Sequence, residues 1–368
     1  MLTDNISPED FPPPKWRPFQ LAFLLLNLVS ITNPENSDRE IVDLLFFPTG
    51  GGKTEAYLGL AAFTLVLRRL RDPSIYSAGV SVLMRYTLRL LTLDQLERAA
   101  TLICALELQR QHNPKLGNHP FEIGLWVGQS ATPNKMGSKR DKDENSAHAR
   151  THAYQRDDKA KPKPVPLERC PWCGAELTTN SFQLLPNPDA PTDLRLICVG
   201  SKKRADGKPA CVFRRNNFLP LIAVDEQIYR RLPCFIIATV DKFANLPWVG
   251  QTGALFGKVT HYDDRDGFYG TGDPKIKGRS LEKRLPPPDL VIQDELHLIS
   301  GPLGTMVGLY ETAIDALCSV TNNDKTIRPK IVASTATVRR ADRQIQALCD
   351  VLSRYTLAGI MGASKSQN

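Results

Sequence analysis

The sequence predicts an α/β fold: a mostly parallel sheet with helices on both faces, interrupted by an insertion that contains four cysteines. The first observation is that strand-length apolar runs alternate with segments of helical periodicity along most of the 368 residues. Strands buried on both faces read as continuous apolar runs, and parallel strands need crossover helices between them. The second observation is that glycine-rich or acidic segments follow two of these runs. In such sheets ligands bind beyond the carboxyl ends of the strands.

Each element rests on its own pattern. An amphipathic helix is expected from Trp16 to about Val29. Apolar runs bounded by turn residues predict strands at 41–47, 78–84, 121–128, 234–239, 291–293 and 330–334. Apolar residues at three- and four-residue spacing predict helices at 56–70, 88–108, 219–231, 304–320 and 338–353.

Changes in composition divide the chain. Residues 131–166 are charged and poor in large apolar side chains, so we expect a mobile basic insertion that cannot bury a core. A solvated linker is the simpler interpretation of its basic residues, and contact with nucleic acid is the other. The expected division is 1–15 flexible lead, 16–130 first part of the domain, 131–166 insertion, 167–213 cysteine insertion, 214–353 second part with an irregular insertion at 250–288, and 354–368 tail.

A glycine-rich turn stands between the strand at 41–47 and the helix that follows it. The turn reads Pro-Thr-Gly-Gly-Gly-Lys-Thr-Glu and spans 48–55. Backbone N–H groups can point at phosphates only where side chains leave room, which the three glycines provide. The residues expected to bind a nucleotide triphosphate here are Thr49, Gly50, Gly51, Gly52, Lys53, Thr54 and Glu55. Lys53 would reach the β- and γ-phosphates, and the Thr54 hydroxyl would bind Mg²⁺.

Two carboxylates, Asp294 and Glu295, follow the strand at 291–293. Asp294 would hold the magnesium and Glu295 would orient or deprotonate an attacking water. Taken alone, a glycine turn is often only a turn, and a strand that ends in Asp-Glu often only meets solvent. Together with Lys53, the pair predicts a catalytic site for nucleotide hydrolysis.

Four of the eight cysteines form a pattern that suits zinc. Cys170 and Cys173 belong to a tight Cys-Pro-Trp-Cys-Gly knuckle, and Cys198 and Cys211 follow within reach. Four thiolates at tetrahedral corners suit Zn²⁺, and its binding would help to fold a loop-rich module. The alternative is two unrelated buried cysteines beside a knuckle that binds no metal. The other cysteines stand alone in apolar surroundings and are expected in the core.

Charge and hydropathy restrict the partners. The formal net charge of +8 fits a polyanion such as nucleic acid. The apolar stretch at 20–30 is too short to span a bilayer, so we expect a cytoplasmic protein without a membrane partner.

Further polar residues sit where the same site would need them. Arg17 and Gln20 precede the glycine turn, and Gln20 could meet an adenine edge or be an ordinary surface amide. Ser334 to Thr337 follow a strand and could sense the carboxylates or simply cap a helix. Hydroxyl, amide and basic residues after other strands are expected to contact nucleic-acid phosphates, although each taken singly could be structural: Thr87, Arg89, Gln95, Thr239 and Lys242.

In this order the segments resemble superfamily 2 helicases. The similar segments are Arg-Pro-Phe-Gln at 17–20, the glycine turn, 87–95, Thr-Val-Asp-Lys-Phe at 239–243, Asp-Glu-Leu-His at 294–297 and Thr-Ala-Thr at 335–337. The longer phrases around the glycine turn and Asp294, and the cysteine knuckle, are most similar to the helicase subunit of the DISARM phage-defence systems. The resemblance covers about 16–353.

The resemblance implies a RecA-like first motor domain of an ATP-driven DNA translocase or helicase, with Mg²⁺ as cofactor and with partner defence subunits. It assigns coupling roles to His297, Thr335, Ala336 and Thr337. The sequence ends soon after Thr337, so the second RecA-like domain, whose arginines would assist hydrolysis, is expected to be missing and this part alone to be weakly active.

Two other functions stay open from the sequence. One is a nucleic-acid-binding module that uses the zinc knuckle and a basic surface beside a vestigial phosphate loop. The other is a phosphate-loop enzyme unrelated to DNA, such as a small-molecule kinase, which would leave Gln20, Thr87 and Thr239 as coincidences.

Overall fold

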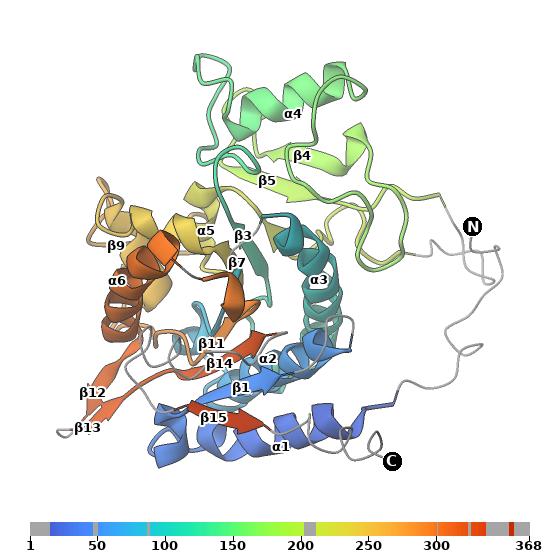
Figure 1. Cartoon of the computed structure of the whole chain (residues 1–368). Helices are drawn as coiled ribbons and strands as arrows, with labels where there is room; N and C mark the ends of the chain where they lie inside the picture. Colours follow the sequence, from blue (N-terminus) through green and yellow to red (C-terminus); the bar gives the residue numbers. More distant parts are fainter. Residues whose placement is uncertain are drawn as a thin grey trace, which may run out of the picture.

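The computed structural model describes residues 15–46, 51–86, 89–201, 211–299, 301–322, 325–335 and 353–356. Its centre is an eight-stranded sheet with the order β15-β1-β14-β11-β2-β7-β3-β6, in which all neighbours run parallel (Figure 1). The strands are β1 Val42–Phe46, β2 Val82–Tyr86, β3 Ile123–Trp126, β6 Leu221–Ile222, β7 Phe235–Thr239, β11 Leu290–Gln293, β14 Lys330–Thr335 and β15 Ser353–Thr356. The predicted fold class is confirmed.

Helices cover both faces of this sheet because alternate side chains of each strand point to opposite faces. The helices are α1 Pro18–Thr32, α2 Lys53–Arg71, α3 Arg89–His112, α4 Ala147–Arg156, α5 Asp225–Arg231 and α6 Gly301–Cys318. Met84 and Ile237 lie on one face of the sheet, which packs against α1, α2 and α3. Leu83 and Ile236 lie on the other face, which packs against α5 and α6.

A fully buried ion pair links the neighbouring strands β1 and β14 near their amino-terminal ends. The Lys330 ammonium on β14 lies 2.6 Å from the Asp43 carboxylate on β1, and neither side chain is exposed. The same ammonium donates to the carbonyl oxygens of Asp38 and Ile41, at 2.8 Å and 2.6 Å. These contacts compensate the burial of both charges and fix the register of β1 against β14.

Several predicted boundaries differ from the structure. The helix predicted at 219–231 is a short strand, β6, followed by α5, since Pro220 cannot continue a helix from Leu219. The irregular insertion at 250–288 contains a three-stranded antiparallel sheet of β8 Val259–Asp263, β9 Gly267–Gly270 and β10 Arg279–Ser280. A β-hairpin, β12 Val320–Asn322 with β13 Lys325–Ile327, follows α6. The helix predicted at 338–353 lies outside the described residues except Ser353, which begins β15.

The prediction that 131–166 buries no core was wrong. This segment contains α4, and its few apolar side chains join the main core, Met136, Ala147 and Val165 among them. Tyr154 meets Phe182 edge to face, with ring centroids 5.7 Å apart. The apolar residues are sparse, but they share one core with Phe182, Leu184, Leu194 and Leu196 of the hairpin of β4 Phe182–Leu185 and β5 Asp193–Leu196.

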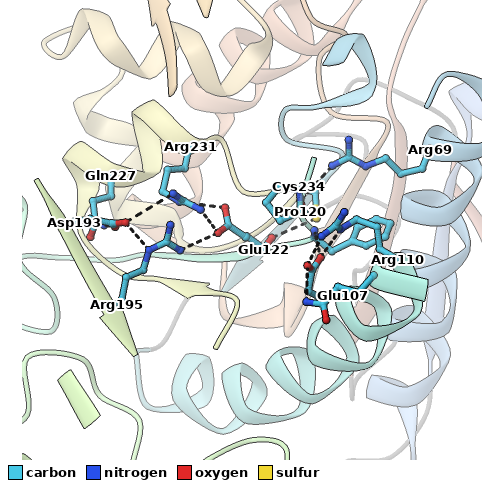
Figure 2. Close-up of polar contacts among 12 residues, drawn as sticks. Arg69, Glu107, Arg110, Pro120, Glu122, Asp193, Arg195, Gln227, Arg231 and Cys234 are labelled. Atoms are coloured by element: carbon cyan, nitrogen blue, oxygen red, sulfur yellow. Dashed lines mark hydrogen bonds and ion pairs between the residues drawn. The ribbon is translucent and has the colours of Figure 1, made fainter. Parts of the chain in front are cut away.

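A charge network centred on the buried Glu122 fastens this hairpin to the sheet (Figure 2). Glu122, just before β3, accepts hydrogen bonds from Arg195 of β5, at 3.2 Å, and from Arg231 of α5. Asp193 accepts from Arg195 at 2.5 Å and from Gln227. Burial raises the pKa of the Glu122 carboxyl, but the charges of Arg231 and Arg195 outweigh it, so the net shift is downward. The cysteine insertion is therefore docked by paired charges as well as by apolar contact.

Candidate functional site

The carboxyl ends of β1, β14 and β11 lie side by side, because β14 pairs with both of the other strands. The glycine turn follows β1, Thr335 ends β14, and Asp294 follows β11. The topology thus brings three sequence-distant segments to one edge of the sheet. The question is whether their side chains meet there.

The described part of the glycine turn is shaped for a close approach of backbone to its neighbours. Gly52 immediately precedes α2 and has a left-handed backbone with φ 95°. This φ favours glycine, and a Cβ at this position would also lie 2.7 Å from Nε2 of Gln20, so that the Gln20 side chain would have to move. Thr49 and Gly50 lie outside the described residues.

Lys53 is buried at the start of α2, and among the described residues its ammonium nitrogen has no hydrogen-bond partner. A buried polar donor without an acceptor costs about 1–3 kcal/mol, and a charged ammonium costs more. The first N–H groups of a helix also lack intrahelical acceptors and attract anions. Both features favour an anionic ligand at this point.

Tyr57 connects the glycine-turn helix to Asp294. Its hydroxyl donates to Oδ2 of Asp294 at 2.8 Å and lies 3.1 Å from Oγ1 of Thr54. Burial, and then the negative charge of Asp294, raise the pKa of Tyr57 well above its ordinary value, so the hydroxyl stays protonated. Sequence reasoning missed this residue. Its only signal is a hydroxyl three residues after Thr54, which places both on one helix face.

Asp294 is buried and its two carboxylate oxygens have separate donors. Ser334 at the end of β14 donates to Oδ1, which also accepts from the backbone N–H of Glu295 at 2.9 Å. Tyr57 occupies Oδ2. Three donors from three elements therefore hold one carboxylate in a fixed orientation between α2 and β14.

Glu295 has a left-handed backbone, with φ 48° and ψ 48°. This conformation is uncommon outside glycine, and such strain of about 1–3 kcal/mol concentrates at functional sites. The carboxylate of Glu295 lies 3.3 Å from Nδ1 of His297, which in turn lies 3.3 Å from Oγ1 of Thr335. The structure therefore links the acidic segment to the end of β14, while Ala336 and Thr337 lie outside the described residues.

Arg17 and Gln20 contact the glycine turn directly. The Arg17 guanidinium donates to the Gly51 carbonyl at 2.6 Å, and the Gln20 amide donates to the Gly52 carbonyl at 2.8 Å. The Gln20 carbonyl oxygen accepts from the backbone N–H of Arg17 at 2.8 Å. Both side chains are thus positioned to respond to the conformation of the turn.

The residues predicted to contact nucleic acid have mixed positions. Thr87 lies outside the described residues, and of Arg89 only the helical backbone is described. Gln95 is half-buried on α3, and within the described parts of the chain its carbonyl oxygen has no partner. Thr239 is buried at the end of β7.

The placement of Lys242 does not fit the prediction of a phosphate contact. Its ammonium is buried and lies 2.7 Å from the Asp225 carboxylate and 3.2 Å from the amide oxygen of Asn134. A buried, ion-paired ammonium is not accessible to a bound strand. Burial first, partly offset by the Lys242 charge, raises the pKa of Asp225 to about 6. Lys242 is therefore a structural anchor of the turn after β7.

The four predicted cysteines converge. Their sulfur atoms all lie within 4.8 Å of one another, with 3.7 Å between Cys170 and Cys211 and 3.5 Å between Cys173 and Cys198. Four thiolates around Zn²⁺ at about 2.3 Å would be separated by about 3.8 Å. The described cysteines are free thiols. This donor set fits a tetrahedral zinc ion.

The cluster is adjacent to α3. Thr101 on α3 donates to the carbonyl oxygen of Pro171 in the knuckle at 2.9 Å, and Cys104 and Cys170 share one core. One turn earlier on the helix, Arg98 forms an exposed ion pair at 3.0 Å with Glu55 of α2. The helix therefore touches both the cysteine cluster and the first turn of α2.

No helix among the described residues is long and apolar enough to cross a bilayer. No protein-family model matches the chain. Structures of the DUF1998 helicase MrfA, bound to DNA or to DNA and AMPPNP, each match 93% of this chain and 27% of that chain, with 11% identity and a TM-score of 0.41. Likenesses at this level carry no argument about function.

A curated protein gives a much stronger match. The DISARM protein DrmA of Bacillus paralicheniformis is 42% identical over 347 residues, and the match covers 90% of this chain. The chain spans 30% of the length of that relative. The resemblance to a DISARM protein that the motifs indicated is thus confirmed: over nine-tenths of its length, this chain is a sequence relative of part of DrmA.

Proposed function

We propose that this chain is the nucleotide-binding part of a nucleic-acid-dependent ATPase of the superfamily 2 type that acts in a DISARM-like phage defence. The observation that carries the proposal is the bridge from Thr54 through the Tyr57 hydroxyl to Asp294. It joins the start of α2 to the acidic strand end, where a magnesium-bound triphosphate would need both. The similarity to a DISARM protein supports the biological setting.

Each residue of the site has a defined role in this proposal. The ammonium of Lys53, which has no hydrogen-bond partner among the described residues, would bind the phosphate oxygens, while Thr54 and Asp294 would hold Mg²⁺. The bound ion would neutralise charge on the phosphate oxygens. Glu295 orients the attacking water, and its contact with His297 passes the change at the carboxylate on to Thr335.

In this proposal the hydrogen bonds of Gln20 and Arg17 to the glycine turn change when a nucleotide binds. Their donated hydrogen bonds to Gly52 and Gly51 hold the turn in its present form. An adenine edge would compete for the Gln20 amide, so nucleotide binding would loosen one of these contacts. The expected partner of the whole site is DNA, which the net charge of +8 suits.

The cysteine cluster has a structural role in this proposal. We infer that Zn²⁺ binds the four thiolates and holds the knuckle against α3. Because α3 also contacts Glu55 of the nucleotide site through Arg98, loss of zinc would weaken the support of that site as well as the insertion.

The decisive experiment measures binding of a fluorescent ATP analogue with Mg²⁺ to wild type and to Lys53→Ala. Lys142→Ala removes an exposed lysine outside the site and is the matched control. We expect at least tenfold weaker binding for Lys53→Ala and no change for the control. Equal binding by all three proteins would remove the basis of the proposal and leave the alternative of a vestigial phosphate loop.

Metal analysis tests the zinc site separately. Wild type should retain a single zinc ion per chain after dialysis against a weak chelator, whereas Cys170→Ser should lose it. Cys318→Ser, a buried thiol away from the cluster, should keep it. A metal-free wild-type protein purified without chelator would leave the knuckle as a metal-independent turn.

A further inference from the structure

Trp248 is the most exposed large apolar side chain in the part of the chain that the structure describes. It is 84% exposed, whereas Leu25 and Val29 on α1 follow at 56%. The indole is the largest apolar side chain, and its exposure to water is unfavourable unless a partner covers it.

The backbone that presents Trp248 is firmly anchored. The N–H of Trp248 donates to the Asn245 carbonyl at 3.0 Å, and Thr252 Oγ1 donates to the Val249 carbonyl at 2.7 Å. Below the turn, Phe243 is buried and meets Trp126 edge to face, with ring centroids 5.2 Å apart. The anchored backbone holds the attachment point of the Trp248 side chain in place, which lowers the conformational entropy lost when the indole binds a partner.

The buried ion pair of Lys242 with Asp225 belongs to the same support. Lys242, Phe243 and the partly buried Leu246 all face inward, and Trp248 alone of the large side chains in this turn faces solvent. Lys242, which was predicted to contact phosphates, thus anchors the turn, and the exposed indole of Trp248 is the group that a partner can reach.

The turn follows the carboxyl end of β7, on the same edge of the sheet as the candidate nucleotide site. Thr239, the last residue of β7, pairs with Tyr86 of β2, and the backbone N–H of Asp294 donates to the Arg85 carbonyl at 3.2 Å. A nucleic acid that crosses this edge would pass the turn. The adjoining segment at 271–278, whose Gly272 contacts Gly250, carries the exposed Lys275.

We propose that Trp248 is a stacking platform for an unpaired base of a single-stranded nucleic acid. The inference rests on the proposed function, which places a polyanion on this edge. An aromatic ring stacks on any base, so the contact would be sequence-tolerant, while cations such as Lys275 attract the backbone. In a duplex the bases are stacked on one another and their faces are not available to the ring.

The test uses fluorescence anisotropy with a labelled oligo(dT) and, separately, a labelled duplex of the same length, at fixed salt. The variants are Trp248→Ala, Trp248→Leu and Trp248→Phe. We expect about five- to hundredfold weaker oligo(dT) binding for the Ala and Leu variants, and less than about threefold for Phe, because Phe keeps an aromatic face. Duplex binding should be nearly the same for all. Indole emission should be quenched by oligo(dT) in wild type and less so in Trp248→Phe.

Three results would overturn the inference. If Trp248→Ala binds oligo(dT) as tightly as wild type, or if none of the proteins binds oligo(dT), the ring contacts no base. If Trp248→Leu binds oligo(dT) as tightly as wild type, the contact is an apolar one, as with a protein partner. The ATP-analogue titration of the same variants separates the two proposals: intact nucleotide binding beside any of these results would sink only the stacking contact.

Discussion

Replacement of Glu122 by glutamine should destabilise the protein by about 2–3 kcal/mol. Removal of one partner from a buried ion pair typically costs about 3–5 kcal/mol. Here the value is smaller, because Arg195 and Arg231 remain partly exposed and Asp193 lies 2.5 Å from Arg195 and 3.9 Å from Arg231. Glutamine keeps the shape of the side chain, so the loss reports charge and not volume.

The assay is thermal unfolding followed by circular dichroism, with Glu144→Gln as the control for an exposed carboxylate. A loss of about 2–3 kcal/mol in a chain of this size corresponds to a fall of roughly 3–4 °C in Tm. Fluorescence from the cysteine insertion should change in the same transition, since the network in Figure 2 docks that insertion onto the sheet.

The pH dependence gives an independent check. The folded state lowers the pKa of Glu122 below its ordinary value of 4.5, since the two arginines outweigh burial. A carboxyl with a depressed folded pKa stabilises the protein above the unfolded pKa, and this contribution is lost as the pH falls. The difference between wild type and Glu122→Gln should therefore be full at pH 7 and shrink below about pH 4.5. If Glu122→Gln unfolds within 0.5 °C of Glu144→Gln at about pH 7, the network does not stabilise the fold.

Three further predictions address other parts of the molecule. Tyr57→Phe removes a donor to Asp294 and should lower the stability of the nucleotide-free protein by about 1–2 kcal/mol in urea unfolding while shifting the Mg²⁺ midpoint of nucleotide binding; an unchanged midpoint would separate Tyr57 from the metal site. Lys330→Met removes the ion-pair partner of the buried Asp43 carboxylate and should cost about 3–5 kcal/mol, which a second change, Asp43→Leu, should partly restore; no restoration would contradict the pairing. Burial, and then the charge of Arg69, lower the pKa of His119 to about 3. The stability that comes from the neutral imidazole is therefore complete above about pH 6.5 and is lost as the pH falls toward 3. His119→Phe should make the free energy of unfolding depend less on pH in this range, and an unaltered pH dependence would refute the prediction.

The positions of Lys53 and Asp294 could be predicted because strand ends in a parallel sheet share one edge. The strand and helix patterns fixed which segments reach that edge, and β14 between β1 and β11 brings them together. Tyr57 could not be predicted in the same way. A tyrosine on a helix usually packs in the core, and its contact with Asp294 exists only in the folded chain.

Contacts between distant parts of the chain also explain why the predictions for Lys242 and for residues 131–166 differ from the structure. Lys242 follows a strand, as a phosphate-binding residue would, but Asp225 on α5 supplies a buried partner that no local pattern reveals. Composition likewise suggested that 131–166 buries no core, because it has few large apolar residues. The apolar faces of β4 and β5 complete its packing from another part of the chain.

Because the cysteine insertion and the sheet share one apolar core, the insertion is not a removable accessory. A minimal nucleotide-binding version of this protein, made by joining β3 directly to α5, would lose one wall of that core and would remove Arg195 and Asp193, the partners that the insertion gives to Glu122 and Arg231. Engineers who graft or shorten this scaffold would need to cut elsewhere, and natural variation in the length of this region should respect the same constraint.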